Sequence, residues 1–153
     1  MNAVREYLLK LRGKRVVFIL VGNELRGDDG FGPLVYELIG LKLPILINAG
    51  ATPEYYTSTI ARLNPDALVF VDAIDAGLEP GSIVYGRLED LEREVVVIST
   101  HRMPLSLIAK VIEVSMSRSL VKLLIGVQVG RLGLGEKMSD AVRDAARVVA
   151  EVI

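Results

Sequence analysis

The sequence has no cysteine, no tryptophan and a single histidine among its 153 residues. Without cysteine, the chain can form no disulfides, thiolate metal sites or cysteine nucleophiles. The chain has 18 Lys and Arg against 19 Asp and Glu, so its net charge is −1. This charge provides no long-range attraction to nucleic acid or anionic lipid. No apolar run approaches the roughly 18 residues that a membrane span needs, and no signal-peptide pattern opens the chain. We therefore expect a cytoplasmic protein with no membrane insertion and no nucleic-acid partner.

The sequence alternates apolar strand-like runs with helical patterns, which is typical of an α/β fold. With 51% hydrophobic and 24% charged residues, the composition is that of one globular domain over residues 1–153. Apolar runs predict strands at residues 15–21, 44–48, 67–72, 94–99 and 120–127, with an extended edge piece at 82–85. Helical spacing predicts helices at 1–12, from 33 onward, 53–62, 104–117 and 139–153, the second with a buried stripe of Leu34, Val35, Leu38 and Ile39. This order predicts a three-layer α/β/α sandwich around a twisted, mostly parallel sheet of about five strands.

Titratable side chains follow three of the predicted strands. Asp28 and Asp29 lie in the glycine-rich segment after the first strand, Asp72 ends the third, and His101 follows the strand at 94–99. Sites in parallel sheets lie outside the carboxyl ends of the strands, so these groups could converge on one edge. Two carboxylates and an imidazole suit a borderline divalent cation such as zinc or nickel.

Each of these residues also has a purely structural interpretation. Asp28 and Asp29 could complement the positive N-terminus of the following helix, Asp72 could bond its own backbone in a turn, and His101 could cap a helix. Other enzyme templates do not fit. The chain has no Gly-x-Ser-x-Gly elbow, no P-loop and too few histidines for a His-Glu-x-x-His site, and its first glycines do not spell a dinucleotide-binding fingerprint.

At these positions the chain resembles the nickel–iron hydrogenase maturation endopeptidases, especially the branch that processes the large subunit of hydrogenase 3, the formate hydrogenlyase type. Three segments carry the resemblance: GNELRGDDGFGPL (residues 22–34), VDAIDAGLEPG (71–81) and STHRMPL (99–105). Two further segments, IGVQ (125–128) and MSDAV (138–142), resemble the family more weakly. One departure is Val129, where the branch tends to have proline, and the helix at 1–12 lies outside the matched core.

The resemblance implies an endopeptidase, of aspartic type, that removes a C-terminal extension from a nickel-loaded hydrogenase large-subunit precursor. The metal-binding residues of the family map onto Asp29, Asp72 and His101, with nickel presented by the substrate rather than held as a resident cofactor. Many relatives have Glu at the position of Asp29, and the hydrogenase 3 branch has Asp.

For the mechanism, our hypothesis is that this trio recognises nickel already held in the precursor, and that Asp29 and Asp72 are either an acid–base pair or ligands only. A metal ion lowers the pKa of a bound water, and a nearby carboxylate can act as base. Asn23, Asp28 and Gln128 are the candidate substrate-binding residues, and Asp75 is a further candidate near the ligands. The rival interpretations are a metal-sensing or precursor-binding chaperone that does not cut and, from fold alone, a hydrolase for a small nucleotide.

Overall fold

The computed structural model describes residues 2–40, 45–94 and 103–153. Its strands are β1 (Val16–Val21), β2 (Ile45–Gly50), β3 (Ala67–Ile74), β4 (Ile83–Arg87) and β5 (Val121–Gln128). Its helices are α1 (Asn2–Leu9), α2 (Phe31–Ile39), α3 (Thr57–Arg62), α4 (Leu88–Glu94), α5 (Leu105–Met116) and α6 (Asp140–Val152). Two short 3₁₀ turns, η1 (Gly27–Gly30) and η2 (Pro53–Tyr56), precede α2 and α3.

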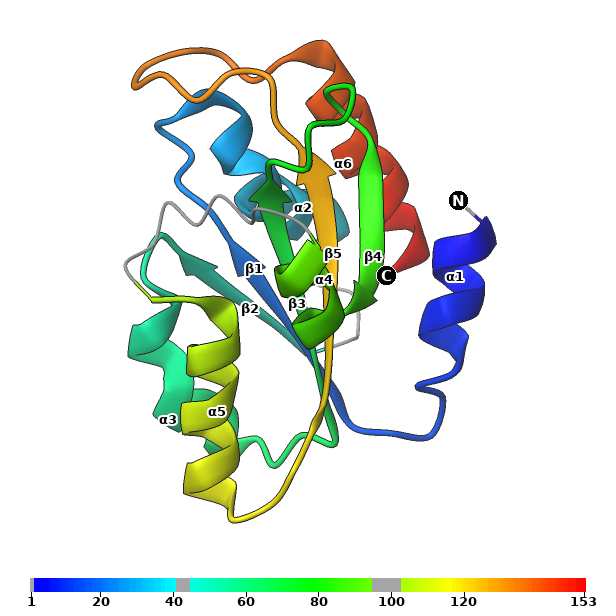
Figure 1. Cartoon of the computed structure of the whole chain (residues 1–153), viewed down its shortest axis with the longest axis vertical. Coiled ribbons are helices and arrows are strands. Elements are labelled where there is room, and N and C mark those ends of the chain that lie inside the picture. Colours follow the sequence, from blue (N-terminus) through cyan, green and yellow to red (C-terminus); the bar gives the residue numbers. More distant parts are fainter. Residues whose placement is uncertain (1, 41–44, 95–102) are drawn as a thin grey trace.

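The strands form one sheet in the order β2-β1-β3-β5-β4 (Figure 1). The pairs β1–β2, β1–β3 and β3–β5 are parallel, and β4 runs antiparallel to β5 at the edge. The chain leaves β1 toward β2 on one side and returns to β3 on the other, so the strand order reverses between β1 and β3. Ligand sites of open α/β sheets lie at this position, outside the carboxyl ends of the two strands.

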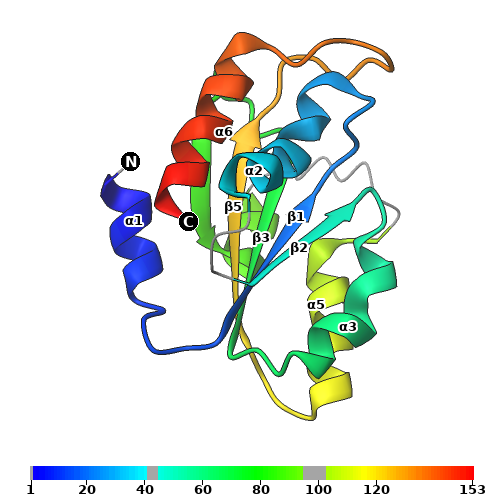
Figure 2. The same ribbon diagram turned by 180° about the vertical axis from the view of Figure 1, so that it is seen from behind.

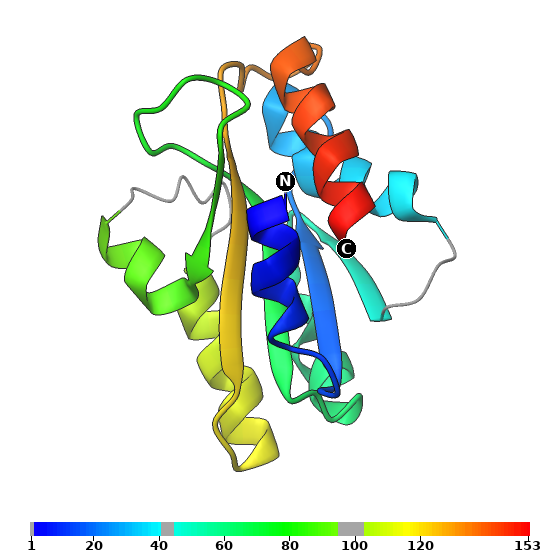
Figure 3. The ribbon, with the colours of Figure 1, turned by 90° about the vertical axis from the view of Figure 1, so that its right-hand side faces the viewer.

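Helices cover both faces of the sheet, as Figures 2 and 3 show. One face packs against α1, α2 and α6 through a core that includes Phe18, Val69 and Ile125. The other packs against α3, α4 and α5 around Phe70 and Leu124. The predicted three-layer α/β/α sandwich is thus confirmed. None of the described helices is long and apolar enough to cross a membrane.

Some local features differ from the sequence predictions, and one predicted strand stays untested. Helix α2 begins at Phe31 rather than at Pro33, and Leu38, which we predicted to be buried, is 44% exposed because it lies on the outer side of the helix. Helix α4 was not predicted, since Leu88 is its one fully buried apolar residue and the rest of its sequence is mostly charged. The strand predicted at 94–99 lies outside the described residues, apart from residue 94, which ends α4.

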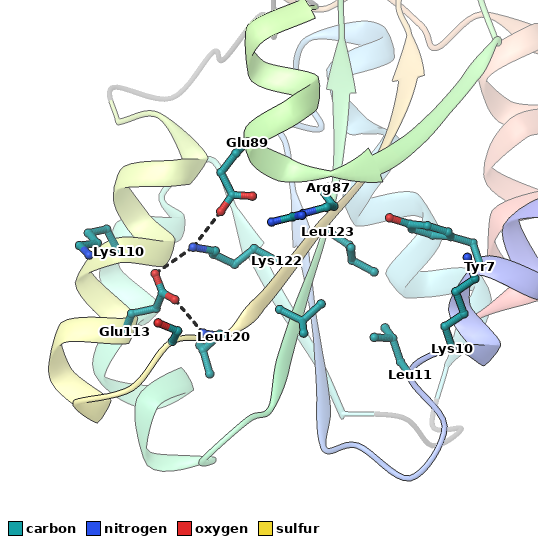
Figure 4. A pocket seen from close by; sticks show the side chains of 12 residues that line it. Tyr7, Lys10, Leu11, Arg87, Glu89, Lys110, Glu113, Leu120, Lys122 and Leu123 are labelled. Carbon is teal, nitrogen blue, oxygen red and sulfur yellow. Dashed lines mark hydrogen bonds and ion pairs between the residues drawn. The ribbon is translucent and has the colours of Figure 1, made fainter.

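A partly buried ion-pair cluster stabilises the junction of α5 and β5, and it supports a stability prediction (Figure 4). Glu113, 7% exposed, accepts hydrogen bonds from the Leu120 N–H at 2.7 Å and from Lys122 Nζ at 3.0 Å. In Glu113→Gln the amide NH₂ must face one of these two donors. We expect the free energy of unfolding to fall by about 1–3 kcal/mol in urea titrations. Glu37→Gln, at an exposed position of α2, should leave it unchanged; equal losses in both variants would contradict this role for Glu113.

Candidate active site at the carboxyl edge of the sheet

Asp29 is held against the end of β1 by a tight reversal of the chain. Gly22, the first residue after β1, has φ +148°, and a Cβ there would lie 1.9 Å from the carbonyl oxygen of Asp29. Only glycine permits so close an approach of the two backbone segments. The Asn23 N–H then donates to Asp29 Oδ2 at 3.0 Å. Asp29 is 1% exposed, so the glycine-rich segment places a buried carboxylate beside the carboxyl end of β1.

Asp72 lies on the neighbouring strand, two residues before the end of β3. Side chains alternate along a strand, and Phe70 and Ile74 both pack in the core beneath α3, α4 and α5. Asp72 is therefore on that face, and its side chain is fully buried. Its Oδ1 accepts the Ala73 N–H at 2.8 Å, which is the local backbone bond foreseen in the structural interpretation. Asp72 thus lies on β3 and Asp29 lies in η1, beside the end of β1, and these two strands flank the reversal of strand order.

His101 lies outside the described residues, as does Arg102. The elements on either side of this segment are tied together, because Glu92 Oε1 of α4 accepts the Ser106 N–H of α5 at 3.1 Å. Helix α5 starts toward the carboxyl edge and packs on the face where Asp72 lies (Figure 1). Within the described residues, no three His, Asp or Glu side chains form a group able to hold a metal ion.

Asp28 is completely buried, and its carboxylate faces another loop rather than the edge of the sheet. Its Oδ2 accepts from the N–H groups of Gly130 at 2.7 Å and Arg131 at 2.9 Å, and its Oδ1 accepts from the N–H of Ser139 at 2.7 Å. The Ser139 hydroxyl donates to the same carboxylate. In this arrangement both carboxylate oxygens of Asp28 accept hydrogen bonds within the protein, and the side chain makes no capping bond to α2. It fixes η1, and so Asp29, to the segment between β5 and α6.

Gln128 has a similar anchoring position at the end of β5. Its Oε1 accepts from the N–H groups of Ala76 and Leu78, and its Nε2 donates to Asp75 Oδ1 and to the Val129 carbonyl. All four hydrogen bonds of the amide are thus made within the protein, which leaves Gln128 to position the loop after β3. The bond from Gln128, followed by one from the Gly77 N–H, lowers the pKa of Asp75.

Val129, the departure noted above, is compatible with this loop shape. The Val129 N–H donates to the Ile74 carbonyl at 3.1 Å, a bond that proline could not make. The residue therefore joins the end of β5 to the end of β3 by a main-chain bond.

Asn23 and Glu54 complete the polar groups of this edge. Asn23 Oδ1 accepts the Leu25 N–H at 2.9 Å, while its amide NH₂ has no hydrogen bond to any described residue. Glu54 was not singled out from the sequence. It lies in η2, just after the carboxyl end of β2, and its Oε2 is buried without a hydrogen-bond partner in the described ranges. The only sequence signal that could have indicated Glu54 is its position directly after Thr-Pro at the end of a predicted strand.

This edge therefore collects carboxylates at the reversal of strand order. Asp29 and Asp72 carry carboxylate oxygens of the kind that divalent cations accept as ligands, and both are shielded from bulk water. Shielding strengthens electrostatic interactions with a bound cation or with charge that develops during a reaction. Asp28 and Gln128 fix the two loops that flank the site. The arrangement suits a pre-organised site for a cation or for hydrolysis.

Comparisons with known proteins identify the family of this chain. Residues 42–153 match the hydrogenase maturation protease family. The chain is 32% identical over 136 residues to the hydrogenase 3 maturation protease of Escherichia coli K12, covering 87% of this chain and 85% of the relative. It is 29% identical over 138 residues to a putative hydrogenase maturation protease of Methanocaldococcus jannaschii, covering 82% and 79%.

Solved structures extend the similarity to the whole fold. The crystal structure of a [NiFe] hydrogenase maturation protease, HycI from Thermococcus kodakarensis KOD1, superposes with a TM-score of 0.80 at 34% identity, covering 98% of this chain and 95% of the other. The solution structure of the endopeptidase HycI from Escherichia coli gives 0.76 at 32%, covering 89% and 86%. On this evidence, the chain belongs to the hydrogenase maturation protease family.

Proposed function

We propose that this protein is an endopeptidase that removes the C-terminal extension of a [NiFe] hydrogenase large-subunit precursor. The relatives support a hydrogenase maturation substrate, since they are named hydrogenase 3 and [NiFe] hydrogenase maturation proteases. The observation that carries the proposal is the pair of buried carboxylates, Asp29 and Asp72, at the point where the strand order reverses. We place the reaction in the cytoplasm. A chain without cysteine forms no disulfides, so it does not need an oxidising compartment.

Nickel recognition is the second part of the proposal. Asp29, Asp72 and His101 would contact nickel that the precursor already holds, so the metal belongs to the substrate. Carboxylate and imidazole donors are compatible with a borderline divalent cation. The two buried carboxylates support this role because they offer negative charge where water is largely excluded. Selection of loaded precursor follows, since an empty precursor brings no positive charge to this edge.

Peptide hydrolysis requires activation of a water and protonation of the leaving amine. Asp29 and Asp72 are the groups that we assign to this task, as an acid–base pair or through the cation that they bind. The Asn23 amide NH₂, which has no hydrogen bond to any described residue, would donate to a substrate carbonyl. Asp28 and Gln128, predicted as substrate-binding residues, fit better as positioning residues, because their polar groups are already bonded within the protein.

The test is incubation of the protein with its large-subunit precursor, purified in nickel-loaded and nickel-free forms. Intact-mass spectrometry should show loss of the C-terminal extension from the loaded form alone. A stable complex with unchanged mass would instead indicate a chaperone that holds the precursor without cutting it. Equal cleavage of the nickel-free form would support the peptidase and contradict nickel recognition.

A further inference from the structure

A pocket lies toward the opposite end of the sheet from Asp29 and Asp72. It encloses about 610 Å³ between α1, the end of β4, α5 and the start of β5 (Figure 4). Leu123 lines it, and five residues along β5 separate Leu123 from Gln128 at the carboxyl edge. At roughly 3.3 Å per residue, the pocket is about 17 Å from that edge. It is therefore separate from the candidate active site.

The two carboxylates of this pocket, Glu89 and Glu113, both form ion pairs with Lys122. Lys122 Nζ lies 2.8 Å from Glu89 Oε1 and 3.0 Å from Glu113 Oε1, as the dashed lines in Figure 4 show. Burial alone would lower the pKa of Lys122, but its bonds to the two carboxylates raise it. The three side chains form a compact, mutually satisfied cluster in the pocket wall. The hydrogen bond from Lys122 and, to a smaller extent, the charge of Arg87 lower the pKa of Glu89.

Three further cations line the pocket: Lys10, Arg87 and Lys110. Within the described residues, no carboxylate oxygen lies within 4.0 Å of any of them. The lining thus carries four cations against two carboxylates, in a chain whose net charge is −1. In Figure 4, Arg87 extends across the pocket between Glu89 and Tyr7. Such a lining attracts anions.

The same surface is apolar in its other parts. Leu11, Leu120 and Leu123 line the pocket between the charged groups. Beside it, α5 has an exposed stripe of Leu107, Val111 and Val114, which are 48%, 38% and 67% exposed. The spacing i, i+4, i+7 puts these side chains on one face of α5, and Lys110 falls on the same face. Adjacent apolar side chains of this kind are typical of interaction surfaces.

We propose that this pocket and the α5 stripe together bind an acidic, amphipathic segment of the precursor, distant from the cleavage site. The proposal rests on the function proposed above for the substrate's identity. Charge complementarity favours carboxylates at Lys10 and Arg87, and the guanidinium of Arg87 can hold a carboxylate with two parallel hydrogen bonds. Apolar side chains of the segment would pack on Leu120, Leu123 and the stripe. Binding here would raise affinity for the precursor without taking part in hydrolysis.

The test compares K10Q/R87Q with the control R62Q/R147Q, which removes the same charge from exposed positions outside the pocket. With nickel-loaded precursor, we expect K10Q/R87Q to raise KM about fivefold to thirtyfold and to leave kcat unchanged. Equilibrium Kd for the precursor should rise by the same factor, and R87K with Lys10 intact should recover most of the affinity. Added salt should weaken binding more in the wild type than in K10Q/R87Q.

The outcomes separate the two proposals. A wild type that binds precursor without cutting it would refute the peptidase, while the Kd values of the variants would still judge the pocket. Unchanged KM and Kd in K10Q/R87Q, or equal changes in the control, would refute the pocket. So would light scattering that shows a wild-type dimer which K10Q/R87Q breaks, because a second copy of this chain would then be the occupant.

Discussion

Asp29→Asn and Asp72→Asn should each reduce kcat/KM for precursor cleavage by about a hundredfold to ten-thousandfold. Asparagine keeps the shape of each side chain and one carbonyl oxygen. That oxygen can still accept the Asn23 N–H at residue 29 or the Ala73 N–H at residue 72. The variants should therefore fold while losing the negative charge that we assign to nickel recognition and water activation. Intact-mass time courses on loaded precursor measure the loss.

Asp140→Asn provides the matched control, because Asp140 is an exposed carboxylate in the first turn of α6. It should cleave at the wild-type rate. Thermal unfolding of all three variants separates lost chemistry from lost structure. Full cleavage by either Asp29→Asn or Asp72→Asn would refute our assignment of the site, whatever the variants' stability.

Asp28→Ala should have the largest effect on stability, lowering the free energy of unfolding by about 3–5 kcal/mol. The substitution leaves the N–H groups of Gly130, Arg131 and Ser139, and the Ser139 hydroxyl, without their acceptor. Because these bonds fix η1 to the segment before α6, cleavage should fall as well, through displacement of Asp29. Urea titration gives the first quantity, and kcat/KM gives the second.

A second substitution distinguishes positioning from direct contact. Asp28→Asn keeps one acceptor oxygen, so it should recover part of the stability and part of the activity. Asp140→Ala removes an exposed carboxylate one residue after Ser139 and should change the free energy of unfolding by less than about 0.5 kcal/mol. If Asp28→Asn abolished cleavage at wild-type stability, Asp28 would have to act on the substrate itself.

The sheet could be predicted from the sequence because each buried strand is a continuous apolar run. Residues 67–72 and 120–127 are fully or mostly buried in the structure, where both faces of the sheet are covered. Helix α6 was equally clear from Val142, Ala146 and Val149, all fully buried. Helix α4 was not, since a mostly charged heptapeptide with one buried leucine has no amphipathic period to recognise.

Part of the candidate site could also be predicted from the sequence, and part could not. Strand ends pointed to Asp29 and Asp72, because the carboxyl ends of parallel strands share one edge. The sequence could not show that Asp28 binds Gly130 and Ser139, since about a hundred residues separate them and only folding brings them together. Ser139 illustrates the same limit. It is the N-cap residue of α6, yet its hydroxyl makes no capping bond and donates to Asp28 instead.

The central claim is that Asp29, Asp72 and His101 meet around one cation. The most direct measurement is a crystal structure of the protein with a divalent cation such as nickel. Our account predicts a single ion with carboxylate oxygens of Asp29 and Asp72 and an imidazole nitrogen of His101 at about 2.0–2.3 Å. An ion bound elsewhere, with these three side chains too far apart to share it, would contradict the account.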